Sequence, residues 1–236
     1  LLFSYLFIIS LATLVLAGAT GWRDLIVSSL IFVGMYSVPF IIGFGSYGTD
    51  ALFILNFAYL FAVMYLLVGI VAVIRKGVES AQSELWLAVL NGVFLFMWIY
   101  NVAAKEWQTL LFAAWAVVFT VGSFIAFRFS SKLHPFFAYG SVGVAFIAAA
   151  TAAQLDGAAL TIAFTIEILA LVITILALTK NVQVALTSSV LFIAPAILSF
   201  ASMVRYMSSQ ELFSRDFFVI IVLAFSLIAA GRFLSS

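Results

Sequence analysis

Residues 51–74 read ALFILNFAYLFAVMYLLVGIVAVI, a stretch of 24 residues without a charged side chain. As a helix rising 1.5 Å per residue it is about 36 Å long, enough to cross a hydrocarbon core about 30 Å thick. A helix also satisfies its own backbone hydrogen bonds, which lipid cannot do. A transmembrane β-strand is about 10 residues long with alternating polarity, and this stretch has neither property. It therefore predicts a membrane-spanning helix.

Eight further stretches have the same character, so we predict about nine spans. They are Leu1–Ala19, Leu25–Phe44, Ala51–Ile74, Leu85–Ala104, Thr109–Phe129, Phe136–Ala153, Ala159–Thr179, Ala185–Val204 and Phe217–Leu234. The connections are short, which makes successive helices antiparallel neighbours. The expected fold is all-α, a polytopic transmembrane helical bundle forming a single domain over residues 1–236. Because the chain starts inside an apolar run and lacks a basic leader segment, we expect it to be part of a longer protein.

The composition agrees with a membrane environment. Of 236 residues, 67% are apolar and 8% are charged, whereas soluble domains carry about 25% charged residues. This excludes an ordinary soluble globule, a nucleic-acid binder with a basic face and a disordered tail. The chain has no cysteine and one histidine, so we expect no metal site and no cofactor. The expected surrounding is the lipid bilayer, with no nucleic-acid partner.

The basic residues predict an orientation, because Lys and Arg concentrate in cytoplasmic loops. Seven of the ten fall on one side of the predicted spans: Arg23, Arg75, Lys76, Arg128, Lys132, Lys180 and Arg232. The other side holds Lys105, Arg205 and Arg215, together with five acids. The side with seven is predicted to be cytoplasmic, which places the C-terminus of the segment inside the cell.

Glu167 is the one acid in the middle of a predicted span. An ionised carboxylate at that depth costs about 2.5–3.5 kcal/mol on insertion scales. We therefore expect its side chain to face the bundle interior or a hydrated cavity, where desolvation favours the neutral acid. Two interpretations remain open. Glu167 is either a proton or cation site, or a protonated carboxyl hydrogen-bonded to a neighbouring helix.

Three other residues are candidates for one site with Glu167. Asn56 enters the third span from the same side and lies at a similar depth, whereas Asn91 is a weaker candidate. Asp50 and Asp156 stand at the outer ends of the third and seventh spans. The hypothesis is an outward-facing cavity lined by all four. For Asp156 we favour a simpler role, in which it starts the seventh helix near the positive end of the helix dipole.

The sixth predicted span has a stripe of small residues. Ser141, Ala145, Ala149 and Ala153 recur every four residues and so share one helix face, where a second helix backbone can approach closely. This predicts helix packing, within the chain or with a partner. Elsewhere, Pro39 and Pro195 lie inside spans and predict kinks.

Five tryptophans divide into two groups by depth. Trp22, Trp86 and Trp107 fall at span ends, where the amphipathic indole ring anchors a helix at the membrane interface. Trp98 and Trp115 lie deeper, and we expect them to pack inside the bundle.

Two stretches resemble a known family. Residues 39–48 read PFIIGFGSYG and are followed by ALFILN at 51–56, while residues 152–167 read AAQLDGAALTIAFTIE. The second stretch is similar to the "LDG-W-tlaWalEa" signature of a large family of predicted bacterial membrane proteins, known as domain of unknown function two-three-three-nine. Asp156, Gly157 and Glu167 match the signature, whereas Ala159 and Phe164 stand where tryptophans are usual. The resemblance implies a longer multi-pass protein of the bacterial inner membrane, and it supplies no activity.

Three functional hypotheses follow. The first is a transporter or permease-like module, because Glu167 lies beneath an acidic outer rim. The alternative is a structural or assembly module of the cell envelope without catalysis, favoured by the small-residue stripe and the missing catalytic motifs. No GxSxG, HExxH or Walker motif is present, and the GxGxxG match at residues 43–48 joins two apolar helices rather than a strand and a helix. An enzyme acting on lipid is therefore the least supported.

Overall fold

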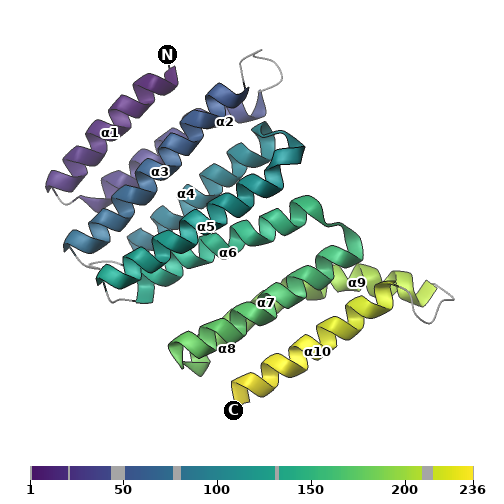
Figure 1. Cartoon of the computed structure of the whole chain (residues 1–236). Helices are drawn as coiled ribbons and strands as arrows, with labels where there is room; N and C mark the ends of the chain where they lie inside the picture. Colours follow the sequence, from purple (N-terminus) through teal and green to yellow (C-terminus); the bar gives the residue numbers. More distant parts are fainter. Residues whose placement is uncertain are drawn as a thin grey trace. The chain divides into compact units, whose positions relative to one another are not determined.

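The computed structural model describes residues 2–20, 22–43, 51–76, 81–130, 133–208 and 215–235. In these ranges the chain is helical apart from short turns (Figure 1). The helices are α1 (Leu2–Thr20), α2 (Arg23–Ile42), α3 (Ala51–Lys76), α4 (Ala81–Val102), α5 (Lys105–Ser130), α6 (Leu133–Gln154), α7 (Gly157–Thr179), α8 (Val182–Ser189), the 3₁₀ turn η2 (Val190–Phe192), α9 (Ile193–Ser208) and α10 (Arg215–Ser235). Eight of the described helices are long and apolar enough to cross a membrane. The predicted all-α polytopic fold is confirmed, and the chain is a multi-pass integral membrane protein.

The contacts within the chain form two compact units, Leu1–Ala150 and Thr151–Ser236. The single domain over 1–236 stays a prediction, because nothing in the structure tests it.

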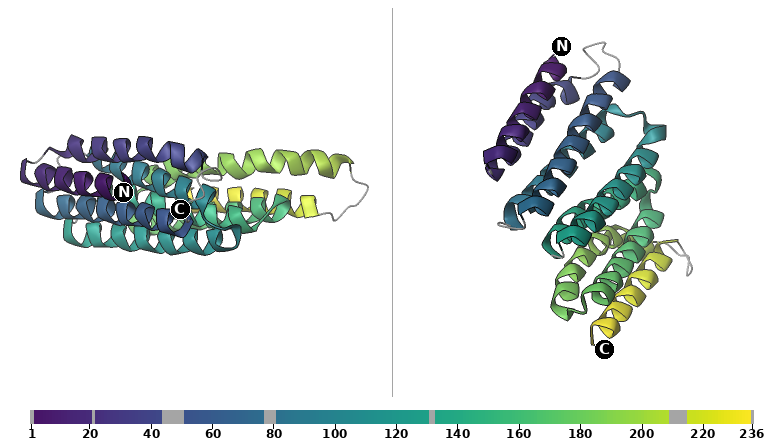
Figure 2. Two further views of the ribbon diagram at one scale, coloured as in Figure 1. Left: turned by 90° about the horizontal axis from the view of Figure 1, so that it is seen from above. Right: turned by 60° about the vertical axis from the view of Figure 1, so that its left-hand side comes forward.

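In the first unit, α3 and α4 form the central pair. Half of the span residues of each are buried, compared with 22% for α1 and 33% for α6. The α1–α2 pair packs on one side of them, through α1 on α3 and α2 on α4, while α5 packs against both central helices. Figure 2 shows the six helices running side by side in this unit. The central position explains why α3 and α4 carry many of the fully buried large side chains, among them Phe61 and Tyr65 of α3 and Trp98 of α4.

Close helix approach in the first unit depends on glycines opposite bulky side chains. The Tyr139 hydroxyl of α6 lies against Gly69 of α3, and Val142 of α6 lies against Gly92 of α4. Gly143 faces Thr120 of α5, where an added Cβ atom would lie 2.7 Å from the threonine hydroxyl oxygen. The face of α6 that packs within the unit is therefore built around Tyr139, Val142 and Gly143.

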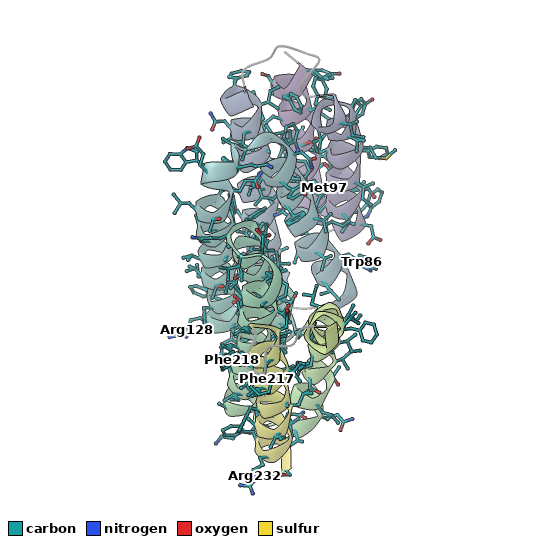
Figure 3. All side chains as sticks on the ribbon, turned by 90° about the vertical axis from the view of Figure 1, so that its right-hand side faces the viewer. Trp86, Met97, Arg128, Phe217, Phe218 and Arg232 are labelled. Carbon is teal, nitrogen blue, oxygen red and sulfur yellow. The ribbon has the colours of Figure 1, made fainter. Side chains whose placement is uncertain are left out.

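In the second unit, α7 and α10 pack along each other, and α8 and α9 pack against α7. The core consists of Val172, Ala185, Phe192 and Ala230. Figure 3 shows basic side chains at helix ends in each unit, with Arg128 in the last turn of α5 and Arg232 in the last turn of α10. Cations there interact favourably with the negative end of the helix dipole.

The predicted eighth span, Ala185–Val204, is not one continuous helix. The structure divides it into α8, η2 and α9, and Pro195 stands in the first turn of α9. Proline has no N–H to donate to the Leu191 carbonyl four residues earlier, and its ring clashes with that carbonyl in an α-helix. The 3₁₀ turn just before it relieves the clash. Pro39 behaves differently, because α2 continues through it and ends at Ile42, three residues later.

The five tryptophans divide into buried and exposed side chains according to their positions within the predicted spans. Trp98 and Trp115 are buried, whereas Trp22, Trp86 and Trp107 are exposed near the starts of helices α2, α4 and α5. The predicted packing of Trp98 and Trp115 inside the bundle is confirmed, and anchoring of the other three at the membrane interface stays a prediction.

Candidate functional site around Glu167

Glu167 lies at the centre of α7, ten residues after Gly157 and twelve before Thr179. At 1.5 Å per residue this is about 15 Å from the start of the helix, and so close to the middle of a bilayer core. The side chain is half-buried rather than buried. The expectation that it faces the bundle interior is therefore met only in part, since the residue keeps intermediate exposure in the chain as described.

The carboxyl group accepts a hydrogen bond from α6. The Thr151 hydroxyl donates to Oε1 of Glu167 at 2.5 Å, and both residues belong to the second unit. Helical side chains point toward the N-terminus of their own helix, so Glu167 reaches back toward the turn at Leu155 and Asp156. The distance is typical of a hydroxyl that donates to a carboxylate. One of the two geometries predicted for Glu167, a hydrogen bond to a neighbouring helix, is thus present.

Glu167 shares a face of α7 with Ala170 and Thr174, away from the face that is buried in the second unit. The buried face carries Thr161 and Thr165, whose hydroxyls donate to backbone carbonyls of α7 itself. The other face carries Ala170 and Thr174, which are exposed. These small side chains leave room beside the carboxyl group for water, a ligand or another helix.

Pro195, which follows the 3₁₀ turn between α8 and α9, lies about level with Glu167. Glu167 is thirteen residues before Lys180 at the end of α7, and Pro195 is thirteen residues after Val182 at the start of α8. Both are thus about 20 Å from the turn that joins the two helices, whereas η2 is about one helical turn nearer to it. Helix α7 contacts α8, η2 and α9, so Glu167 and Pro195 lie at a similar depth in one unit.

The other predicted site residues are not gathered around Glu167 by any described contact. Asp156 precedes α7 with extended backbone angles, φ −124° and ψ 157°, and its side chain makes no capping hydrogen bond. It lies about 16 Å from Glu167 along the helix axis. Its predicted place at the start of the helix is confirmed. The following turn needs Gly157, whose φ of +58° strains any residue with a Cβ atom.

Asn56 is exposed on α3, on the same face as Phe53 and Leu60. It therefore does not point into the core of the first unit, as a residue lining an interior site would. Asp50 lies outside the described residues. Since Asn56 and Glu167 belong to different units, a joint cavity of Asp50, Asn56, Asp156 and Glu167 stays a prediction.

Sequence reasoning missed Thr151 and the hydroxyl cluster around Tyr65, and it ranked Asn91 only as a weaker candidate. Thr151, the donor to Glu167, carries no charge and lies in a run of alanines, so only the α6–α7 geometry identifies it. Asn91 is buried and donates to the Ala62 carbonyl of α3 at 2.9 Å. Tyr65 of α3 hydrogen-bonds to Ser29 of α2 at 2.7 Å and to Ser10 of α1. All are uncharged polar residues of apolar spans, so no solvation cost made them conspicuous in the sequence.

In the part of the chain that the structure describes, no three His, Asp or Glu side chains lie close enough together to hold a metal ion. Comparison with protein-family models, with curated proteins and with solved structures found no match. A function for this chain can therefore be inferred only from its own residues and their geometry.

Proposed function

We propose that the chain is a transport-type membrane module in which Glu167 carries a proton or small cation. The observation that supports this most directly is a half-buried carboxyl group at the centre of a membrane helix, held by the Thr151 hydroxyl. An ionisable side chain at such depth raises the free energy of membrane insertion, and residues of this kind typically mark ion or proton pathways. The open small face at Ala170 and Thr174 offers a route to the carboxyl oxygen.

The helix break gives a second reason. In many transporters, discontinuous helices place unwound backbone beside ion sites near the middle of the membrane. Here the 3₁₀ turn η2 interrupts the regular α-helical hydrogen bonding of the α8–α9 path, and Pro195 just after it lies at about the depth of Glu167. Irregular backbone at that depth is tolerated where protein or a water-filled cavity surrounds it. A carboxyl group and a broken helix at a similar depth are thus the arrangement expected of a site that binds and releases an ion.

The location belongs to the same proposal. From the resemblance to the bacterial family, the protein is a multi-pass protein of the inner membrane, and from the distribution of Lys and Arg its C-terminus is cytoplasmic. Single-cysteine labelling from either side of intact cells tests the orientation. The chain has no cysteine of its own, so each introduced thiol is unique.

The decisive experiment measures ion flux. The purified protein is reconstituted in liposomes loaded with a pH-sensitive dye, and internal pH is followed after a proton or cation gradient is imposed. We expect Glu167→Gln to abolish the protein-dependent flux, because the amide cannot release a proton. Glu106→Gln, which neutralises an exposed acid in the first turn of α5, should leave it unchanged. Equal flux in the wild type and Glu167→Gln, or no flux in the wild type, contradicts the proposal.

A second candidate is an assembly module, and a separate observation favours it. The packed face of α6 carries Tyr139, Val142 and Gly143, which leaves Ser141, Ala145 and Ala153 exposed and Ala149 half-buried. Small residues on an open membrane-helix face are suited to close contact with another helix. We therefore propose this stripe as the surface for a helix of a partner, either a second copy or another membrane protein.

Cysteine cross-linking tests this second candidate. Ala145→Cys should form an intermolecular disulfide or a cross-link to a partner in the membrane. Val117→Cys, at an equally exposed position of α5, is the matched control and should remain monomeric. Equal cross-linking at the two positions, or none at Ala145→Cys, would count against the assembly role.

A further inference from the structure

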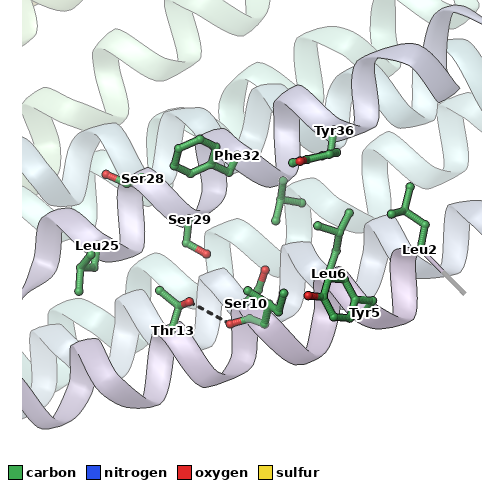
Figure 4. A pocket seen from close by; sticks show the side chains of 12 residues that line it. Leu2, Tyr5, Leu6, Ser10, Thr13, Leu25, Ser28, Ser29, Phe32 and Tyr36 are labelled. Atoms are coloured by element: carbon green, nitrogen blue, oxygen red, sulfur yellow. Dashed lines mark hydrogen bonds between the residues drawn. The ribbon is translucent and has the colours of Figure 1, made fainter.

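Helices α1 and α2 enclose a cavity of about 520 Å³ between them, within the first unit. Its lining includes six hydroxyl-bearing side chains, Tyr5, Ser10, Thr13, Ser28, Ser29 and Tyr36, and no charged one. The volume falls within the range typical of small-molecule sites, about 300–1,000 Å³. Figure 4 shows the Ser10 and Ser29 side chains pointing toward each other across this space.

Two hydroxyl groups that line the cavity, those of Ser10 and Ser29, belong to a buried cluster of three that Tyr65 completes behind the lining. Tyr65 of α3 is fully buried and bonds to both Ser29 and Ser10, which are themselves buried. Three hydroxyls bring three protons, and the two bonds among them use two. One proton is left for an acceptor outside the cluster. Thr13 does not add a donor, since its hydroxyl already donates to the Ile9 carbonyl at 2.9 Å.

The depth of this cluster restricts the ligand. Ser10 lies ten residues from Thr20 and Ser29 six residues from Arg23, which places the hydroxyls about 9–15 Å inside the helix ends on that side. A charged headgroup at this depth would be costly, and the lining offers no opposite charge. A phospholipid headgroup is therefore a poor fit, whereas an uncharged molecule dissolved in the hydrocarbon core fits well.

The cavity mouth adds flat apolar surface. Tyr5, Phe32 and Tyr36 line it with more than half of each side chain exposed. Aromatic side chains favour stacked or edge-on contact with another ring. Together with a hydrogen-bond donor from the hydroxyl cluster, these aromatic side chains favour a ligand with a planar ring that bears a carbonyl oxygen.

We propose that the cavity between α1 and α2 binds an uncharged, lipid-soluble quinone, with the ring between the aromatic side chains and one carbonyl oxygen accepting a hydrogen bond from the Ser10–Tyr65–Ser29 cluster. The site is independent of Glu167, which lies in the other unit. No redox step is part of this inference.

The test compares two probes, each of which has one six-membered carbon ring and a decyl tail. Decylbenzoquinone carries the carbonyl oxygens and decylbenzene lacks them, and native mass spectrometry of the detergent-solubilised protein counts bound molecules during a titration. We expect one decylbenzoquinone per chain, bound about fivefold more tightly than decylbenzene, which is the effect of one net hydrogen bond.

Variants separate the cavity from the rest of the surface. Ser29→Ala and Tyr65→Phe should remove the preference for the quinone, while Ser28→Phe, which fills the cavity from an exposed position, should weaken both probes. Ser4→Ala, at an exposed position of α1 outside the cavity lining, is the matched control and should bind like the wild type. Equal binding of the two probes, a preference that survives Ser29→Ala, or a copurifying charged phospholipid that Ser28→Phe displaces would overturn the proposal.

Discussion

Thr151 and Glu167 are sixteen residues apart, and the threonine hydroxyl of α6 donates a 2.5 Å hydrogen bond to the carboxyl Oε1 of α7. A turn of two residues, Leu155 and Asp156, joins the two helices. The bond therefore fixes the end of α6 to the middle of α7. It also gives the mid-membrane carboxyl group a donor that lipid would not supply.

This pair predicts a measurable coupling. Thr151→Val keeps the shape of the side chain but removes the donor, and should lower the free energy of unfolding by about 1–3 kcal/mol. In a double-mutant cycle with Glu167→Gln the coupling energy should be about 1 kcal/mol, read from denaturant unfolding in detergent. Thr174→Val, at an exposed position on α7, serves as the control. A cycle that closes additively means the bond contributes nothing to stability.

Two glycines one turn apart on α6 should respond differently to alanine. At Gly143 the new Cβ atom meets the Thr120 hydroxyl at 2.7 Å and the Ala116 carbonyl at 3.3 Å, and the second is backbone that cannot rotate away. Gly143→Ala should therefore destabilise by about 1–3 kcal/mol. At Gly140 the nearest atom, the Ser123 hydroxyl oxygen, is 3.8 Å away, so Gly140→Ala should be close to neutral. Thermal unfolding of the two variants side by side checks the contrast, and equal melting temperatures would refute it.

Asn91 should tolerate an apolar replacement better than an acidic one. Its amide nitrogen donates to the Ala62 carbonyl, while its Oδ1 is buried without a hydrogen-bond partner among the described residues. Asn91→Leu removes both polar atoms together and should change stability by no more than about 1 kcal/mol. Asn91→Asp places a carboxyl oxygen next to the Ala62 carbonyl oxygen. It should lower the free energy of unfolding by about 2–3 kcal/mol. The reverse order of the two unfolding midpoints would show that Oδ1 has an essential partner, such as a buried water.

Pro195→Ala should convert the interrupted helix into a continuous one. The alanine N–H can donate to the Leu191 carbonyl, and the ring clash disappears, so stability should rise by about 1–3 kcal/mol. If the break serves the ion site, flux in liposomes should fall while the unfolding temperature rises. Ala194→Gly, next to it in α9, controls for a general change in flexibility. Flux that stays at the wild-type level would separate the helix break from the function of Glu167.

The limits of the spans could be predicted well from the sequence because apolar length is a local property. Predicted spans such as Ala51–Ile74 and Ala159–Thr179 differ from helices α3 and α7 by only two residues at any end. The interruption before Pro195 could be predicted only as a kink. How a helix accommodates a proline depends on its surroundings, and here the chain uses a 3₁₀ turn that buries Phe192 in the core of the second unit.

The residues of the candidate sites were harder to predict from the sequence than the limits of the spans. Glu167 was predictable because a carboxyl group in an apolar span is conspicuous by its solvation cost. Its donor Thr151 and the cluster of Ser10, Ser29 and Tyr65 were not, because a hydroxyl in a membrane helix bonds equally well to its own backbone, as Thr165 does to Thr161.

By itself, then, the sequence determined the solvent of this protein, the approximate limits of most of its helices, and the one carboxyl group that membrane energetics make costly. Those properties depend on hydrophobicity and length, which are summed along the chain. Only the tertiary structure decided which faces of the helices pack, which hydroxyls meet, and how far Glu167 stays exposed. Those depend on the rotation and crossing of helices, which are set by close contacts such as Gly143 against Thr120 rather than by composition.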